Sequence, residues 1–234
     1  MGTAYCGWQK QPNQKTIQGE IENAIKVSMG LDCEVFASGR TDAGVHALGQ
    51  TAHFDVPDSV PTSKIPEILN CVLNDDIVIK SARDVSQDFH SRFSIKKKTY
   101  LYRIINANKT TAFLANRVSY IKKKLNIQKM EEASSLLIGK HNFRGLCSSN
   151  TSATDFVREI FDIKILKNED EIDIEVCGSG FLYNMVRIIV GTMVDYSLGL
   201  ISKQDVLSAL NDGDRTKAGR TMPACGLYLK ETFY

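Results

Sequence analysis

The segment from Phe181 to Leu198 constrains the fold most, because a helix formed there is apolar around most of its circumference. Such a helix has no polar face for solvent and must lie inside a protein core. Arg187 falls within it, and a buried guanidinium is costly without a compensating partner. We therefore expect a carboxylate near Arg187, in an ion pair that is either architectural or functional.

Further helices are predicted where apolar residues recur at helical spacing. The three stripes are Ile17, Ile21, Ala24 and Ile25; Ile65, Ile68, Leu69 and Val72; and Ile127, Met130, Ser134, Leu137 and Ile138. A shorter helix is expected from Lys203 to Leu210, because Ser202 and Asp205 stand at capping-box spacing.

Strands are predicted where apolar and polar residues alternate. Thr51 to Val56 alternates strictly, as a half-buried strand requires, whereas both faces of Thr99 to Ile105 are largely apolar or aromatic, as in a central strand. The remaining predicted strands are a hairpin of Phe161 to Leu166 with Glu171 to Val176 across Lys167 to Asp170, and a closing strand at Leu227 to Lys230.

These elements predict an α+β fold with largely antiparallel pairing, because they lack the regular crossovers of a doubly wound parallel sheet. A chain of 234 residues, 43% of them hydrophobic, can form two modest cores or one large one. The patterns separate into two halves, which we place at residues 1–95 and 96–234. The polar segment from Gly139 to Asp155 is too long for a simple connection, so we expect a functional or mobile loop there.

Charge is distributed very unevenly. Net charge is only +2, but Phe89 to Met130 holds eleven of the 29 Lys and Arg residues and no Asp or Glu, which leaves a net charge of −9 (+2 minus 11) on the rest. A basic region on an acidic body is typical of proteins that bind a phosphate backbone. The alternative is that these cations only solubilise exposed strand ends and a turn.

Several classes of protein are disfavoured. No apolar run approaches the roughly 20 residues of a membrane span, and the N-terminus lacks the pattern of a secretory signal, so we expect a cytoplasmic location. The scattered cysteines form no metal-binding pair, and we interpret them as reduced, mostly buried thiols. His46 and His53 are interpreted as a loop and a strand histidine, because nothing completes a metal site around them.

Asp42 is the first candidate for chemistry. It lies in the Gly-flanked segment Gly39 to Ala47 beside Arg40, whose positive charge favours the ionised carboxylate. Such a carboxylate could be a nucleophile, a base or an anchor, although an Asp in a turn more often makes only local hydrogen bonds.

Two other features have both functional and structural interpretations. Tyr100 follows Lys96 to Lys98, a combination that suits a stacked base and its phosphates, but a strand tyrosine is more often part of a core. Gly178 to Gly180 could hold a phosphate at a helix N-terminus, and a plain strand-to-helix turn explains it equally well.

Taken together, these segments resemble the tRNA pseudouridine synthase A family over nearly the whole chain. The matching motifs are Gly2 to Gln9, Thr16 to Glu20, Gly39 to Ala47, Phe89 to Ser94, Lys98 to Ile104, Gly180 to Gly191 and Gly226 to Leu229. The resemblance implies the pseudouridine synthase fold: two α/β subdomains with mainly antiparallel sheets joined around a central cleft and helices on the outer faces. Residues 1–95 would carry the catalytic aspartate, and residues 96–234 the active-site tyrosine and arginine.

The resemblance also implies roles for individual residues. Asp42 would be the essential carboxylate, Tyr100 would stack on the target base, and Arg187 would pair with Asp42. The substrate-binding residues would be Arg40, which helps to extrude the nucleotide, Leu227, which lines the pocket, and His46 and Arg92.

The implied reaction converts uridine to pseudouridine at positions 38 to 40 of the tRNA anticodon arm, after the base has left the stack. The N1–C1′ bond breaks, the uracil turns and C5 bonds to the sugar, with no cofactor and no metal. A carboxylate can form a covalent adduct at a sugar carbon or remove a sugar proton, and the sequence does not choose between these routes. The family resemblance further implies a homodimer that shares one tRNA.

Two departures from the family pattern stand out. Family members usually begin with a short strand and a Tyr-Asp pair before the Gly-Thr, whereas Met1 here precedes Gly2 directly; a missing strand would leave a sheet edge exposed. Arg220 and Met222 stand before Pro223 where proline or small residues are more usual, a change we expect to be tolerated.

Two rival functions remain. One is an RNA-binding protein of the same fold without catalysis, which the presence of Asp42, Tyr100 and Arg187 argues against. The other is a hydrolase of glycosidic bonds, which generally needs a second carboxylate that is not found near Asp42.

Overall fold

The computed structural model describes residues 1–57, 60–109, 111–151 and 153–234. The chain divides into two compact units, described separately below. The N-terminal unit comprises Met1–Ile95 together with Tyr234, and the C-terminal unit comprises Lys96–Phe233.

The N-terminal unit is built around helix α1, Ile17–Met29, which the helical stripe predicted. Thr16 caps its start by accepting a hydrogen bond from the Gly19 amide, and Gly30 ends it in the left-handed conformation. The core packed around α1 consists of Tyr5, Trp8, Ile21, Ala24, Ile25, Val35, Ile65, Leu69 and Ile77.

The second predicted helix is shorter than expected. A 3-10 turn at Thr62–Lys64 leads into α2, Ile65–Asn70. Ile65 and Leu69 are buried, but the helix ends before Val72, which is exposed.

The strand predicted at Thr51 to Val56 is largely wrong. Only Ala52–His53 form a strand, β3, which pairs antiparallel with β1, Phe36–Ala37. Ala52 is exposed, whereas Phe54 and Val56 pack against the core without strand pairing. Because β1 offers only two residues to pair with, the strand cannot extend beyond His53. The alternation of apolar and polar residues therefore reflects core packing by an irregular segment. A second two-residue strand, β2, covers His46–Ala47.

The C-terminal unit contains a sheet in the order β9-β4-β8-β7-β6, with antiparallel neighbours throughout this series. Its strands are β4 Lys97–Ile105, β6 Gly139–Asn142, β7 Val157–Asn168, β8 Glu171–Gly178 and β9 Leu227–Phe233. The short β5, Ser119–Tyr120, runs parallel to β4. The predicted α+β class, the central position of β4 and the β7–β8 hairpin are therefore confirmed.

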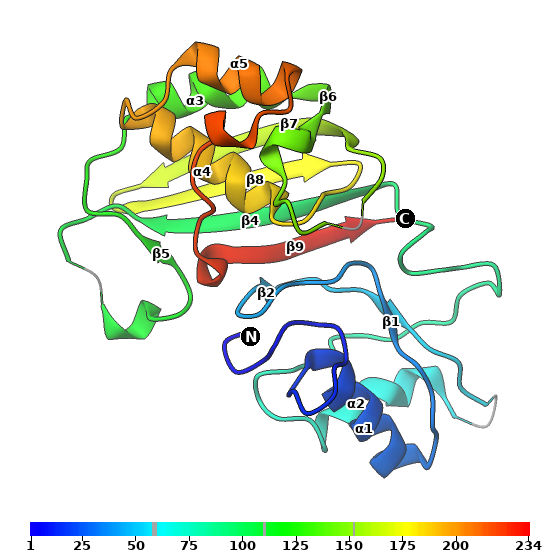
Figure 1. The fold of residues 1–234 in the computed structure, drawn as a ribbon. Helices are drawn as coiled ribbons and strands as arrows, with labels where there is room; N and C mark the ends of the chain where they lie inside the picture. The colour runs from blue at the N-terminus through cyan, green and yellow to red at the C-terminus, as the bar shows by residue number, and fades with distance from the viewer. Residues whose placement is uncertain (58–59, 110, 152) are drawn as a thin grey trace. The chain divides into compact units, whose positions relative to one another are not determined.

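Three helices cover one face of this sheet (Figure 1). They are α3 Ile127–Leu137, α4 Met185–Ser197 and α5 Lys203–Asn211. Asn126 caps α3, and Ser202 and Asp205 form the predicted capping box at α5. Eleven of the 13 residues of α4 are buried, as its apolar sequence predicted.

Two expectations about segment boundaries are corrected. Helix α4 begins at Met185 rather than near Phe181, so Gly178 to Gly180 do not form its N-terminus and cannot cradle a phosphate there. The polar segment Gly139 to Asp155 contains β6 and a 3-10 turn, Phe143–Leu146, whose Phe143 and Leu146 are fully buried.

The remaining short turns are 3-10 helices at Ala112–Leu114, Arg215–Lys217 and Ala224–Gly226. Ser152, in the polar segment, and Thr110, in the basic stretch, lie outside the described residues. None of the helices within the described ranges is long and apolar enough to cross a membrane.

The cysteines are free thiols, but most are not buried. Only Cys147 is buried, while Cys6 and Cys71 are exposed and the other three are intermediate. The expectation of mostly buried thiols is therefore wrong.

Candidate active site

Asp42 lies in the loop that connects β1 to β3 in the N-terminal unit. The base of this loop is closed by the Ser38 amide, which donates to the Thr51 carbonyl at 2.7 Å, and by the Gln50 amide group, which donates to the Gly39 carbonyl at 2.9 Å. Ser38 and Gln50 also form a hydrogen bond between their side chains. These hydrogen bonds fix the conformation of the loop, although the strands that flank it are only two residues long.

Asp42 itself begins a tight turn. The Val45 amide donates to the Asp42 carbonyl at 3.1 Å, and Gly44 within the turn has a φ of +76°, which a residue with a Cβ rarely adopts. Asp42 is half-buried and the neighbouring Arg40 is exposed. The backbone thus presents the carboxylate from a constrained turn.

The first eight residues support this turn from outside the loop. The Trp8 amide donates to the Thr41 carbonyl at 2.9 Å, and Trp8 is part of the buried core. Gly7 has a φ of +83°, and a Cβ there would lie 2.5 Å from the Thr41 carbonyl oxygen, so only glycine permits this approach. The opening motif that carried the family resemblance is therefore structural support for Asp42, a role that its sequence alone did not indicate.

His46 is also part of this support. Its side chain is 2% exposed, and its Nδ1 accepts a hydrogen bond from the Gly2 amide at 2.9 Å. An Nδ1 that accepts a hydrogen bond from an amide carries no proton. Arg92, by contrast, is exposed in another segment of the same unit, and its guanidinium lies 5.5 Å from the centre of the Phe93 ring.

Tyr100 lies in the middle of the sheet of the C-terminal unit, where it pairs with Val176 of β8 and Leu229 of β9. Its ring is 8% exposed and meets Phe181 edge to face, with 5.1 Å between ring centres. The β4–β9 register shifts between Thr99 and Tyr100. Leu227, at the start of β9, is buried and pairs with Tyr102.

Arg187 is less buried than the sequence predicted. It lies in the first turn of α4 and is half-buried, because the helix begins only two residues earlier. Its Nε donates to the Met222 carbonyl at 2.6 Å and its Nη1 to the Asn184 side-chain oxygen at 2.7 Å. These two neutral oxygens help to orient the guanidinium.

Asn184 is a site residue that the sequence analysis missed. It has a φ of +59° just before α4, and its side-chain nitrogen donates to Ser148 Oγ at 2.9 Å. The side chain therefore links the loop at Ser148 to the guanidinium of Arg187. An Asn three residues before an Arg at a helix start was the only available signal.

The unusual Arg220 has a local partner. Its amide and its Nε both donate to the carboxylate of Asp195 on α4, at 2.9 and 2.7 Å. The backbone at Arg220 approaches α4 so closely that a Cβ on Gly191 would lie 1.8 Å from the Arg220 carbonyl oxygen. Met222 is buried, and its carbonyl is the acceptor for Arg187. These contacts show how the protein accommodates Arg220 and Met222 at positions where proline or small residues are more usual.

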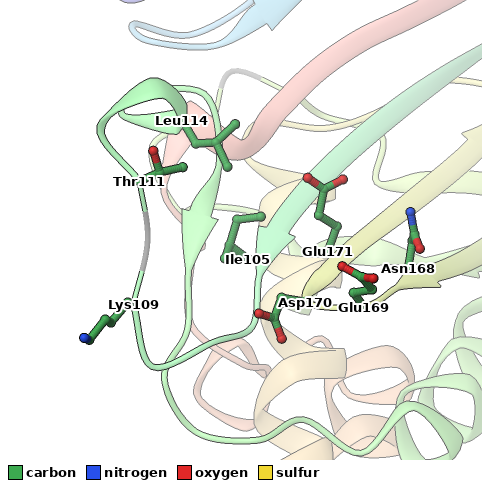
Figure 2. Close-up of a pocket in the computed structure, with 8 residues that line it drawn as sticks. All are labelled: Ile105, Lys109, Thr111, Leu114, Asn168, Glu169, Asp170 and Glu171. Carbon is green, nitrogen blue, oxygen red and sulfur yellow. The ribbon is translucent and has the colours of Figure 1, made fainter.

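The hollow shown in Figure 2 has different chemistry. It is a cavity of about 480 Å³ where the β7–β8 hairpin tip faces the loop after β4. Glu169, Asp170 and Glu171 gather on the hairpin side, while Lys109 extends away from them (Figure 2). Three carboxylates disfavour a phosphate backbone, and no predicted site residue lines this cavity. Within the part of the chain that the structure describes, no group of His, Cys, Asp and Glu side chains is arranged to hold a metal ion.

Comparison with known proteins defines the class. A family model described as tRNA pseudouridine synthase matches residues 1–94 and 133–234. The chain belongs to this family of isomerases, as its motifs predicted. The unmatched interval contains every Lys and Arg of the Phe89 to Met130 stretch except Arg92.

Individual relatives match the whole chain. The chain is 46% identical to the tRNA pseudouridine synthase A of Caldicellulosiruptor saccharolyticus over 233 residues, which cover 100% of this chain and 96% of that protein. It is 46% identical to the tRNA pseudouridine synthase A of Thermoanaerobacter sp., with the same coverage. It is also 46% identical to the tRNA pseudouridine synthase A 2 of Clostridium tetani, of which it covers 95%.

Proposed function

We propose that this protein isomerises uridine to pseudouridine at positions 38 to 40 of the tRNA anticodon arm. The observation that carries the proposal is the turn at Asp42, which lies in the matching motif Gly39 to Ala47 and is held by the opening segment, the loop base and Gly44 together. A carboxylate fixed in this way suits a reaction that depends on the position of one acidic group.

In the proposed reaction, the target base leaves the stack and its N1–C1′ bond breaks. The uracil turns and C5 bonds to C1′; C5 then loses its proton and N1, freed from the sugar, gains one, so the product is an isomer of the substrate. Asp42 acts on the sugar, either by forming an ester at C1′ that is later displaced or by removing and returning a sugar proton. Both routes regenerate the carboxylate and need no cofactor.

The other residues bind and orient the substrate. Arg187, oriented by Asn184 and Met222, pairs with the Asp42 carboxylate, and Tyr100 stacks on the target base. Leu227 contributes apolar surface, and Arg40 and Arg92 contact the RNA. His46 is better placed as a positioning residue, because it is buried and bound to the Gly2 amide.

The proposed partner is tRNA, bound by a homodimer in the cytoplasm. The eleven cations of the Phe89 to Met130 stretch support this partner, because they match the charge of a phosphate backbone. Crosslinking of tRNA exclusively outside this stretch would contradict its role.

Tritium release from tRNA labelled at uridine C5 tests the proposal. The wild-type protein should release tritium, and Asp42→Asn, which removes the negative charge while keeping the shape, should bind tRNA but release none. Asp32→Asn is the matched control, because Asp32 is an exposed acid of the same unit. Tritium release by Asp42→Asn at the wild-type rate would contradict the assignment.

The same assay separates the rival functions. Binding of tRNA without tritium release by the wild type would indicate an RNA-binding protein that lacks catalysis. Release of uracil itself would indicate a glycosidic hydrolase. Sequencing the modified positions then tests the proposed sites on the anticodon arm.

A further inference from the structure

A cluster of aromatic rings in the N-terminal unit ends at an exposed phenylalanine. Phe93 is 75% exposed, although its ring centre lies only 4.4 Å from that of His90. Behind His90 the rings continue to His53 at 4.7 Å and then to Phe36 at 5.2 Å, the last pair being stacked with an angle of 23° between planes. Phe93 is therefore the outermost ring of a packed series.

The turn that carries Phe93 is rigid. The amides of Phe93 and Ser94 both donate to the His90 carbonyl, at 3.1 and 2.9 Å, and the His90 amide donates to Ser94 Oγ at 3.0 Å. These reciprocal bonds define the His90–Ser94 turn. Because these bonds hold the backbone of the turn, binding a ligand there has less backbone freedom to remove.

The turn is also anchored to the body of the unit through Ser91, which is fully buried. Ser91 Oγ donates to the Phe36 carbonyl at 2.6 Å and lies 2.8 Å from His53 Nδ1. The hydroxyl of Tyr234 donates to the Ser91 carbonyl at 2.8 Å. Buried polar contacts thus fix the base of the turn, while Phe93 itself takes no part in the core.

A cationic group lies beside the exposed ring. The Arg92 guanidinium lies 5.5 Å from the Phe93 ring centre, in the range of a cation–π contact, and Arg92 is itself exposed. The turn lies at the start of the Phe89 to Met130 stretch, which contains no Asp or Glu. An exposed ring beside a guanidinium matches a nucleobase with its phosphate, because the base can stack and the guanidinium can bind the anion.

We infer that Phe93 is a stacking platform for an unpaired nucleobase of the bound tRNA, with Arg92 contacting the adjoining phosphate. The inference rests on the proposed tRNA substrate. The base concerned is distinct from the uracil that reacts, which the proposed function assigns to Tyr100. Phe93 therefore contributes to binding and not to the chemical step.

Binding of fluorescent tRNA by Phe93→Ala tests the platform. The dissociation constant should rise about 5- to 100-fold, since that range corresponds to the loss of one stacked base. Phe93→Trp should restore binding, because it retains an aromatic face. Phe161→Ala is the matched control, since Phe161 is 44% exposed in the other unit and lies outside the Phe89 to Met130 stretch, and it should bind as the wild type does.

The dependence of binding on salt separates the two residues. Phe93→Ala should weaken binding without changing the slope of log K against log salt concentration. Arg92→Gln should reduce that slope by about 0.7 to 0.9, the value for one lost phosphate contact. Binding by Phe93→Ala within twofold of the wild type, or equal weakening by Phe161→Ala, would overturn the inference.

A fluorescent base identifies the contact directly. In tRNAs that carry 2-aminopurine at one unpaired purine position at a time, at least one position should be quenched by the wild-type protein and not by Phe93→Ala. Identical quenching at every position would overturn the inference. A change in oligomeric state on sedimentation of Phe93→Ala would also overturn it, because the ring would then be a contact between two copies of the chain.

These measurements do not depend on turnover. Wild-type protein that shows the Phe93-dependent binding but releases no tritium would contradict the proposed reaction and support the stacking platform. Tritium release at a saturating tRNA concentration by Phe93→Ala at the wild-type rate, together with a raised KM, is the result expected if both are correct.

Discussion

At the scale of single residues, the sequence predicted candidate site residues but not the contacts that orient them. Asp42, Tyr100 and Arg187 were identified by type and motif. Asn184, which holds the Arg187 guanidinium and links it to Ser148, was not. Its left-handed backbone places the side chain beneath the first turn of α4, and that geometry cannot be inferred from apolar periodicity.

Asn184 offers a test of positioning that separates strain from function. Asn184→Ala removes the Arg187 contact and leaves a non-glycine residue at φ +59°, whereas Asn184→Gly removes the same contact but relieves the strain. We expect the glycine variant to be more stable than the alanine variant by about 1 kcal/mol in urea unfolding. Both variants should lose activity, on the order of 10- to 100-fold in kcat, because the guanidinium loses its hydrogen bond to Asn184.

The conservative change provides the control. Asn184→Asp keeps an oxygen for Arg187 and tolerates the left-handed conformation, so it should retain more activity than either of the other variants. If activity instead followed stability across the three variants, with glycine the most active, Asn184 would have a structural role only.

At the scale of elements, regular periodicity predicted well and short irregular pairing did not. Helices α1 and α3 and the β7–β8 hairpin were predicted because their apolar faces repeat over several turns or residue pairs. Helix α5 was predicted from the capping box of Ser202 and Asp205. The strand at Thr51 to Val56 was overpredicted, because alternation does not reveal that the pairing partner is two residues long.

Tertiary contacts explain the other errors at this scale. Phe143 and Leu146 are buried by a 3-10 turn inside a segment whose polar composition suggested a loop. The apolar residues Phe181 and Leu182 belong to the approach to α4 rather than to the helix, because Asn184 interrupts the helical backbone. In both cases, burial was set by packing against distant residues rather than by local pattern.

The packing of the opening segment on the Asp42 loop gives a second prediction. Gly7→Ala would place a Cβ 2.5 Å from the Thr41 carbonyl oxygen at a φ of +83°. We expect it to lower the free energy of unfolding by about 2–4 kcal/mol, from overpacking and backbone strain together. Tritium release should fall about 100-fold, because the turn that holds Asp42 must shift.

Gly30 supplies the matched control for that variant. It has a φ of +71°, but a Cβ there would have no neighbour within 4 Å. Gly30→Ala should therefore cost only the backbone strain, about 1–2 kcal/mol, and leave turnover unchanged. A loss of turnover in Gly30→Ala as large as in Gly7→Ala would show that activity follows overall stability and not the support of the Asp42 turn.

At the scale of the whole molecule, charge is separated along the chain rather than spread over it. A net charge of +2 conceals +11 within Phe89 to Met130 and −9 elsewhere. The backbone of one part of this stretch is fixed by the Asn106 side chain. This side chain donates to the carbonyls of Ile121 and Lys123 at 2.9 and 2.8 Å and accepts from the Leu125 amide at 3.0 Å. One side chain thus fixes the backbone that carries Lys122 to Lys124, all of which are exposed.

This arrangement predicts that the position of the positive charge, and not its total, governs tRNA binding. Replacing Lys122, Lys123 and Lys124 by Gln should reduce the slope of log K against log salt concentration by about 2 to 3, since each lost phosphate contact contributes about 0.7 to 0.9. Lys10, Lys26 and Lys64, which pair with Glu22, Asp32 and Glu67, form a matched control when replaced by Gln, because the net charge changes equally. Their replacement should leave the slope within about 0.5 of the wild-type value, because these lysines lie outside the basic stretch. Equal slopes for the two triple variants would mean that tRNA responds only to the overall charge of the protein, and the Asn106-held lysines would then have no special role in binding.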